Sequence, residues 1–217
     1  MNFPLCPRFQ AVLFDMDGTL LDTLSDMQDA VNHILLENGW PQRTLEEIRA
    51  FVGNGAAKLM ERAIPEPIAP QRFQEILSTY KDWYQAHNCV KTAPYPGIPE
   101  VLAELGVKTA VVSNKPDATT KALAEKFFPG MPALGQRDGV DPKPSPALVA
   151  QALSDLGVRP ENAVYVGDSE VDVATARNAG LPLIAVSWGF RGREKLEIAG
   201  AEHIADTAPQ LLKMLCR

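Results

Sequence analysis

The sequence has few cysteines, no long apolar run and no excess of positive charge, and each deficiency excludes a class of protein. Its only cysteines, Cys6, Cys89 and Cys216, lie far apart and show no metal-binding spacing. We therefore expect no disulfide framework and a cytoplasmic location. No apolar stretch approaches the roughly 20 residues that a membrane-spanning helix needs, so no membrane association is expected. Residues 1–10 contain two prolines and lack the apolar core of a secretory signal.

The charge balance argues against binding to nucleic acid. The chain has 27 acidic and 21 basic residues, which gives a net charge of −6. A nucleic-acid-binding protein typically presents an overall basic surface, and this composition does not provide one. Hydrophobic residues make up 46% of the chain, as in ordinary globular proteins. The 217 residues accommodate one large domain or a core domain with a modest insertion.

Two hydrophobic patterns divide the chain. Between about residues 22 and 88 the apolar residues recur only at helical spacing. Elsewhere short apolar strands, near residues 11–17, 108–113, 163–166 and 183–187, alternate with helices, which is typical of a parallel α/β sheet. We therefore predict a doubly wound, Rossmann-like α/β core formed by residues 1–20 and 90–217. Residues 21–89 are predicted to form a small α-helical domain inserted after the first core strand.

The most informative segment is D-M-D-G-T, residues 15–19, at the end of the first predicted strand. Strand alternation directs the side chains of Asp15 and Asp17 to the same side. Because two carboxylates this close raise each other's pKa, the pair indicates a bound cation, and Mg²⁺ is the obvious candidate. Gly18 lets the backbone come close to a metal or substrate.

Three further polar segments complete a plausible site. They contain Ser113 and Asn114, Lys143, and the pair Asp168 and Asp172. Open α/β sheets bind ligands at the carboxyl ends of their strands, where these segments are expected to lie. The set fits phosphoryl transfer, in which one carboxylate attacks phosphorus, another moves the proton, and a metal offsets the charge. Lys143 and Ser113 would hold the phosphoryl oxygens.

Each segment also has a simpler structural interpretation when taken alone. The Asp17-Gly18 dipeptide is common in turns, and Ser169 with Asp172 forms a capping box for the next helix. Lys143 lies in a proline-rich loop, where lysines are usually solvated. The order of the segments and their placement at strand ends favour the functional interpretation.

In content and order, these segments resemble the signature motifs of the haloacid dehalogenase-like hydrolase superfamily, especially its phosphoglycolate phosphatase-like branch. The resemblance covers essentially the whole chain and implies that residues 21–89 are a cap domain. It implies that Asp15 is the nucleophile and Asp17 the general acid/base, a choice that the residue chemistry alone leaves open. It also implies that Asp15, the backbone carbonyl of Asp17 and Asp168 bind Mg²⁺.

The resemblance assigns roles to four other residues. Ser113 and Asn114 would bind the phosphoryl group, and Thr19 would position the region around Asp17. Asp172 would hold a metal-bound water or orient Lys143.

Substrate specificity is expected to lie in the inserted helices. Asn54 and Lys58 belong to a polar loop at a helix start, which suits an anion and makes them candidate substrate-binding residues. The same segment is also explained as a helix end followed by a surface lysine. Lys115 is expected to be a solvated surface charge. Arg191 and Arg193 lie in a loop after a strand and are candidate substrate contacts, but a solvated surface position is preferred for both.

We predict a Mg²⁺-dependent phosphatase for a small phosphorylated metabolite, with 2-phosphoglycolate as the first choice and a monomer or homodimer as the assembly. A phosphosugar mutase, or a phosphatase for a sugar phosphate, nucleotide or pyrophosphate, remains an alternative. A dehalogenase needs no acid beside its nucleophile, so Asp17 favours phosphate esters. A non-catalytic binding protein would be expected to lack at least one of Asp15, Asp17, Lys143 and Asp168, and all four are present.

Overall fold

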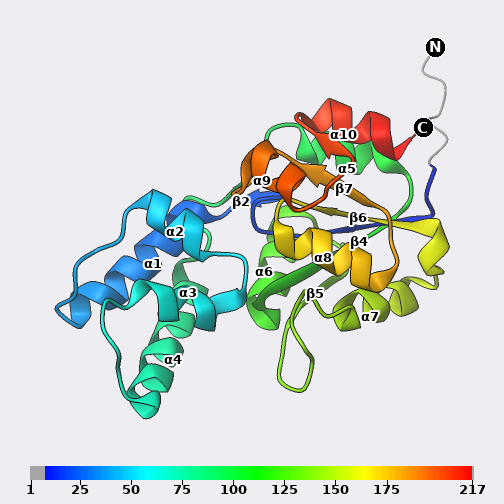
Figure 1. The fold of residues 1–217 in the computed structure, drawn as a ribbon. Helices are drawn as coiled ribbons and strands as arrows, with labels where there is room; N and C mark the ends of the chain where they lie inside the picture. Colours follow the sequence, from blue (N-terminus) through cyan, green and yellow to red (C-terminus); the bar gives the residue numbers. More distant parts are fainter. Residues whose placement is uncertain (1–7, 217) are drawn as a thin grey trace.

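The computed structural model describes residues 8–216, which are built around a six-stranded parallel sheet (Figure 1). Its strands are β1 (Ala11–Phe14), β4 (Lys108–Pro116), β5 (Ala133–Gln136), β6 (Ala163–Gly167), β7 (Leu183–Val186) and β8 (Ile204–Ala205). The spatial order β5-β4-β1-β6-β7-β8 reverses direction between β1 and β6. Open parallel sheets bind ligands at the carboxyl edge beside such a reversal, and β1 carries the D-M-D-G-T segment there.

Helices cover both faces of the sheet because the side chains of β1 alternate between two hydrophobic clusters. Val12 and Phe14 pack in the cluster that includes residues of α5 (Ile98–Leu105), α6 (Asp117–Phe127) and α10 (Ala208–Leu215). Ala11 and Leu13 pack in the cluster that includes residues of α7 (Ala147–Leu156) and α8 (Glu170–Ala179). This arrangement confirms the predicted doubly wound α/β core. A short helix, α9 (Gly192–Ile198), follows β7.

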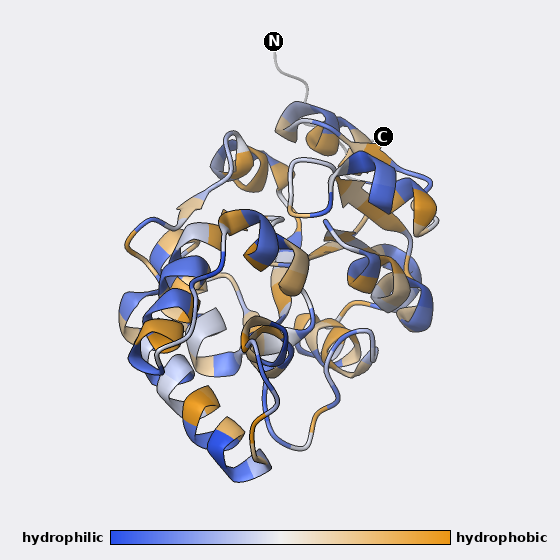
Figure 2. Cartoon of the chain, turned by 60° about the vertical axis from the view of Figure 1, so that its left-hand side comes forward, coloured by the Kyte–Doolittle hydropathy of each residue, from blue (hydrophilic) through white to orange (hydrophobic). Residues whose placement is uncertain are grey.

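The stretch with helical spacing forms four helices that share a hydrophobic cluster of their own. They are α1 (Leu24–Glu37), α2 (Leu45–Phe51), α3 (Gly55–Ala63) and α4 (Pro70–His87), and we call them the cap. Figure 2 shows hydrophobic and hydrophilic residues alternating along these helices. The capping box that the sequence indicates at the start of α2 is present, since Thr44 and Glu47 exchange hydrogen bonds.

Both connections between the cap and the sheet pass through one small ribbon. In it, β2 (Leu21–Asp22) pairs antiparallel with β3 (Ala93–Pro94). The pairing holds the two connections side by side and places the cap near the carboxyl end of β1 (Figure 1). The sequence does not predict this ribbon, because strands of two residues leave no periodic pattern.

Two sequence expectations concern thiols and membranes. Cys89 and Cys216 are free thiols. Cys6 lies outside the described residues, as do residues 1–7 of the N-terminal segment in which no secretory signal is expected. Across residues 8–216, no helix combines the length and the apolar character required to cross a membrane.

Candidate active site

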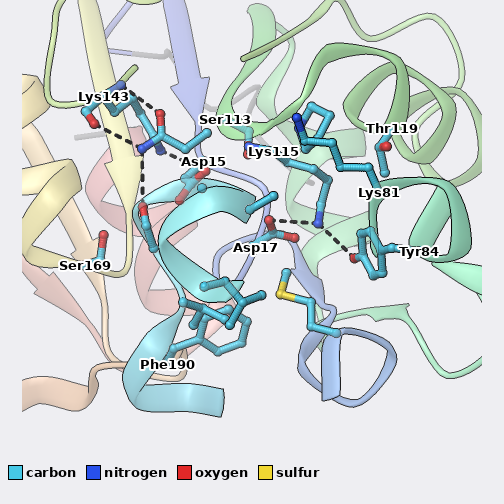
Figure 3. Close-up of a pocket in the computed structure, with 18 of the residues that line it drawn as sticks. Asp15, Asp17, Lys81, Tyr84, Ser113, Lys115, Thr119, Lys143, Ser169 and Phe190 are labelled. Atoms are coloured by element: carbon cyan, nitrogen blue, oxygen red, sulfur yellow. Dashed lines mark hydrogen bonds and ion pairs between the residues drawn. The ribbon is translucent and has the colours of Figure 1, made fainter. Parts of the chain in front are cut away.

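A cavity of about 260 Å³ lies between the cap and the carboxyl edge of the sheet (Figure 3). The four sequence segments converge on it, although they lie up to about 150 residues apart along the chain. The predicted residues that line it are Asp15, Asp17, Ser113, Asn114, Lys143 and Asp168. The remaining walls come largely from apolar and aromatic side chains of the cap.

Lys143 is the most densely bonded group in the cavity wall. Its ammonium lies 2.9 Å from Asp15 Oδ1, 2.8 Å from Asp172 Oδ1 and 3.1 Å from the Tyr165 hydroxyl. These three acceptors use the full donor capacity of a lysine. Burial alone would lower the pKa of Lys143, but the carboxylates of Asp15 and Asp172 outweigh it and hold the pKa well above its usual value. The loop lysine is therefore buried and charged rather than solvated.

Asp15 combines a fixed orientation with one free oxygen. Its backbone N–H bonds to the Val166 carbonyl at 2.8 Å, and its Oδ1 accepts from the Met16 N–H at 2.7 Å in addition to Lys143. Burial and the nearby Asp172 carboxylate raise the pKa of Asp15 to about 7, although Lys143 opposes the shift. Within residues 8–216, no hydrogen-bond donor contacts Oδ2, which leaves this oxygen available to a ligand.

Asp168 is held from both sides near Asp15. Its Oδ1 accepts from the Thr19 hydroxyl at 3.2 Å and its Oδ2 from the Phe190 N–H at 2.7 Å. Burial, followed by the charges of Asp172 and Asp15, raises the pKa of Asp168 well above its ordinary value. Such clustering of buried carboxylates is costly unless a cation compensates it.

The acids fit an oxygen-ligated cation. One oxygen from each of Asp15, Asp168 and Asp172 lies within 4.8 Å of the others. Asp172 is already saturated, because Oδ2 accepts from Ser169 at 2.6 Å and from two backbone N–H groups while Oδ1 accepts from Lys143. Asp15 and Asp168 retain free lone pairs, so these two side chains could hold the cation. The contacts of Asp172 favour a role in orienting Lys143.

Gly18 and Thr19 lie against the Asp168 carboxylate and do not line the cavity. Gly18 has φ = +83°, and a Cβ at this position would overlap the Asp168 carboxylate. The side chain of Thr19 is fully buried and donates to the same carboxylate. Both residues were expected near the metal or substrate, and neither lines the cavity.

Ser113 and Asn114 differ in what they can offer a ligand. The Asn114 amide is engaged with backbone, accepting from Lys143 N–H at 2.7 Å and donating to the Lys143 carbonyl at 3.0 Å and the Gly53 carbonyl at 3.3 Å. Asn114 therefore fixes the Lys143 loop rather than presenting a free amide. Among residues 8–216, the Ser113 hydroxyl accepts only from the Lys115 N–H at 3.2 Å, so its proton remains available for a phosphoryl oxygen.

Asp17 takes part in a buried ion pair that the sequence analysis missed. Its Oδ2 lies 3.1 Å from the Lys115 ammonium, and its Oδ1 accepts from the Thr23 hydroxyl at 2.7 Å. The Lys115 side chain is only 3% exposed and also donates to the Tyr84 hydroxyl of α4 at 2.8 Å. The expectation that Lys115 is solvated is wrong, because the cap covers it. The only sequence signal was its position directly after Ser113-Asn114.

Two predicted cap residues lie away from the cavity. Asn54 accepts from Arg62 at 2.9 Å, and Lys58 forms a surface ion pair with Glu61 at 2.6 Å. Neither side chain lines the cavity, whereas the neighbouring Gly53 and Gly55 do. The expectation that Asn54 and Lys58 bind substrate is therefore not supported, since each has an acceptable partner on its own helix.

Arg191 differs from the expected solvated charge. Its side chain is 6% exposed and donates to the Arg49 and Val52 carbonyls of the cap, each at 2.6 Å, and to Glu170 at 2.9 Å. It thus joins the loop after β7 to the end of α2. Arg193 is a surface residue as expected, pairing with Asp206 at 2.7 Å.

Comparison with known proteins yields consistent matches over most of the chain. A family model described as haloacid dehalogenase-like hydrolase matches residues 12–186, which include all four motif segments. The chain is 35% identical over 202 residues to a phosphoglycolate phosphatase of Caulobacter vibrioides, covering 88% of this chain and 84% of the relative.

Solved structures show the same fold. A candidate phosphoglycolate phosphatase from Lactobacillus delbrueckii subsp. bulgaricus has a TM-score of 0.90 and 36% identity, covering 96% of this chain and 99% of that one. A mutant of CbbY from Rhodobacter sphaeroides, in complex with xylulose-(1,5)bisphosphate, has a TM-score of 0.75 and 28% identity, covering 94% and 96% of the two chains.

Proposed function

Because the chain belongs to the haloacid dehalogenase-like hydrolase family, we propose that it is a Mg²⁺-dependent phosphatase for a small phosphomonoester. One observation carries this proposal. A single cavity holds the free oxygen of Asp15, a second carboxylate at Asp17, and the ammonium of Lys143 against Asp15. These are the groups that phosphoryl transfer through a covalent aspartyl intermediate requires.

The residues divide the two chemical steps between them. Asp15 Oδ2 attacks phosphorus, the bond to the ester oxygen breaks, and Asp17, which enters this step as the protonated carboxylic acid, gives its proton to the departing alkoxide. Asp17 then takes a proton from a water that attacks the phosphoaspartyl group, which releases phosphate and restores the Asp15 carboxylate. The Ser113 hydroxyl donates to a phosphoryl oxygen during both steps, and the positive charge of Lys143 beside Asp15 stabilises the negative charge that develops there.

Asp15 and Asp168 are the side chains that would hold Mg²⁺, with the backbone carbonyl of Asp17 as a further ligand. When bound, the ion offsets the repulsion between an anionic nucleophile and an anionic substrate. The buried carboxylates of both residues, each with a free lone pair, support this assignment. Asp172 and Tyr165 keep Lys143 directed at Asp15.

The substrate proposed first is 2-phosphoglycolate, because the Caulobacter vibrioides relative is a phosphoglycolate phosphatase and its likeness spans most of both chains. A sugar bisphosphate is the second candidate, since the similar CbbY mutant was solved with xylulose-(1,5)bisphosphate. Both molecules carry a phosphate and a second anionic group on a short carbon frame.

The proposal is tested by measuring phosphate release from a panel of phosphomonoesters with and without Mg²⁺. Asp15→Asn should abolish turnover while the protein stays folded, because an amide cannot attack phosphorus in this way. Asp155→Asn is the matched control, since Asp155 is exposed and accepts a hydrogen bond from the exposed Gln151. Normal phosphate release by Asp15→Asn would contradict the assignment of Asp15 as nucleophile. Full activity after chelation would contradict the requirement for Mg²⁺.

A further inference from the structure

The cavity contains a second buried lysine, Lys115, on the side away from Lys143. Figure 3 shows Lys115 and Tyr84 on the side of the cavity away from Lys143, with Asp17 beside Lys115. Lys115 comes from the end of β4, whereas Tyr84 comes from α4 of the cap. Both side chains line the cavity, and Tyr84 is 3% exposed.

This side of the cavity has donors that the protein leaves unused. A lysine ammonium carries three N–H groups. Lys115 donates one to Asp17 and one to the Tyr84 hydroxyl. The Tyr84 oxygen accepts from Lys115, so its own proton needs another acceptor. Among residues 8–216, no acceptor contacts that proton. Two adjacent donors, one of them charged, therefore stand at the cavity wall without a protein partner.

The surroundings keep these donors effective and in place. The Lys115 ammonium lies 4.6 Å from the centre of the Tyr84 ring, and the Tyr84 ring stacks on Tyr80 at 5.8 Å. Burial raises the pKa of the Tyr84 hydroxyl well above its ordinary value, so the hydroxyl keeps its proton. Lys81 and Asp82, within the turn before Tyr84 on α4, also line the cavity, and their opposite charges offset each other.

We propose that Lys115 and Tyr84 form the subsite for the second anionic group of the substrate, a carboxylate or a second phosphate. This inference rests on the proposed function, because it places the reacting phosphate at Asp15. The anion accepts from the third N–H of Lys115 and from the Tyr84 hydroxyl. A phosphoester with a neutral tail leaves both donors unpaired inside the protein and is disfavoured for that reason. The enzyme thus selects phosphoesters that carry a negative charge at both ends.

Equilibrium binding tests the subsite without requiring turnover. The first probe is 3-phosphonopropionate, whose carbon–phosphorus bond is not hydrolysed by a phosphatase. The second probe has nearly the same size and keeps the phosphonate, but a neutral amide replaces its carboxylate. In the presence of Mg²⁺, the wild-type protein should bind the carboxylate probe at least about 10-fold more tightly than the amide, as one charge-assisted hydrogen bond provides. Calorimetric titration measures both dissociation constants.

The variants assign that preference to the two residues. Tyr84→Phe removes one neutral donor but keeps the ring, and it should reduce the preference about 3-fold, since a neutral donor contributes less than a charged one. Lys115→Met should abolish it. Tyr95→Phe is the matched control, because Tyr95 lies outside the cavity, and it should keep the preference. Thermal melting of each variant confirms that it is folded.

Three outcomes would overturn the subsite. They are equal binding of both probes by the wild type, binding of neither probe, and a preference that survives in both Tyr84→Phe and Lys115→Met. Failure of the proposed function is distinguishable, because a protein that binds the carboxylate probe selectively but releases no phosphate from any ester retains the subsite and loses the activity.

Discussion

Asp26 and Thr92 join the two connections between cap and sheet. Asp26 lies in the first turn of α1, and its Oδ2 accepts from the Thr92 hydroxyl at 2.7 Å and the Thr92 N–H at 2.9 Å. The same carboxylate accepts from the N–H groups of Val90 and Lys91. Asp26 is 1% exposed, so backbone and hydroxyl donors replace water around a buried charge. The first connection is thereby locked to the second.

Asp26→Asn should lower the free energy of unfolding by about 2 to 4 kcal/mol. The substitution replaces one of the two accepting carboxylate oxygens by an NH₂ group, whose donors would face the backbone N–H groups that Asp26 now accepts from. Urea unfolding measures the loss. The control is Asp29→Asn, since Asp29 forms an exposed pair with Lys91 at 2.6 Å and should contribute less than about 0.5 kcal/mol. Equal effects of the two substitutions would show that the buried contacts of Asp26 contribute no more than a surface pair.

Tyr165→Phe should impair turnover while changing substrate binding little. The Tyr165 hydroxyl accepts from Lys143 at 3.1 Å, and its loss leaves one N–H of the buried ammonium unpaired. We expect kcat to fall about 10-fold with KM nearly unchanged, together with a loss of about 1 to 3 kcal/mol of stability. Steady-state kinetics and urea unfolding measure the two effects. A kcat equal to that of the wild type would mean that Asp15 and Asp172 suffice to orient Lys143.

Stabilisation by Mg²⁺ should increase with pH. The pKa of Asp15 in the metal-free folded protein is about 7, above the ordinary 3.8, so the folded state binds more protons than the unfolded state between these values. Stability from this group is complete below about pH 4 and is lost as the pH rises through about 7. The pKa of Asp168 is raised in the same direction.

Because Mg²⁺ binds carboxylates in their charged form, it should raise Tm more at about pH 8 than at about pH 5. Thermal melts with and without Mg²⁺ at the two pH values measure the difference. Asp15→Asn should reduce the pH dependence, since it removes one of the titrating groups. A rise in Tm that is the same at both pH values would contradict the placement of Mg²⁺ at these acids.

The sequence was sufficient for the fold class and for the residues at strand ends, because both depend on local patterns. The alternation in β1 predicts two covered faces, and the polar residues at the carboxyl ends of β1, β4 and β6 must meet at one edge of a parallel sheet. The short strand β5 and the ribbon of β2 and β3 left too little periodicity to be identified.

The residues that sequence reasoning missed depend on contacts between distant segments. Lys115 is buried by Tyr84, 31 positions earlier, and Arg191 is buried against Arg49, 142 positions earlier. Their sequence neighbourhoods are those of ordinary surface residues. Tyr165 stands between two valines of a buried strand, where a tyrosine hydroxyl needs a partner, but the sequence does not identify that partner as Lys143.

Arg191 should control how the loop between α2 and α3 sits over the cavity. Its guanidinium donates to two cap carbonyls at once, and the short ammonium of a lysine cannot reproduce this geometry. Arg191→Lys should therefore raise KM several-fold, while Arg193→Lys, which changes a surface pair with Asp206, should leave KM unchanged. Steady-state kinetics compares the two variants, and limited proteolysis of the 52–54 loop reports its release independently of substrate. If Arg191→Lys matches Arg193→Lys in both measurements, the cap loop is held by other contacts, of which the bond from Asn114 to Gly53 is the nearest alternative.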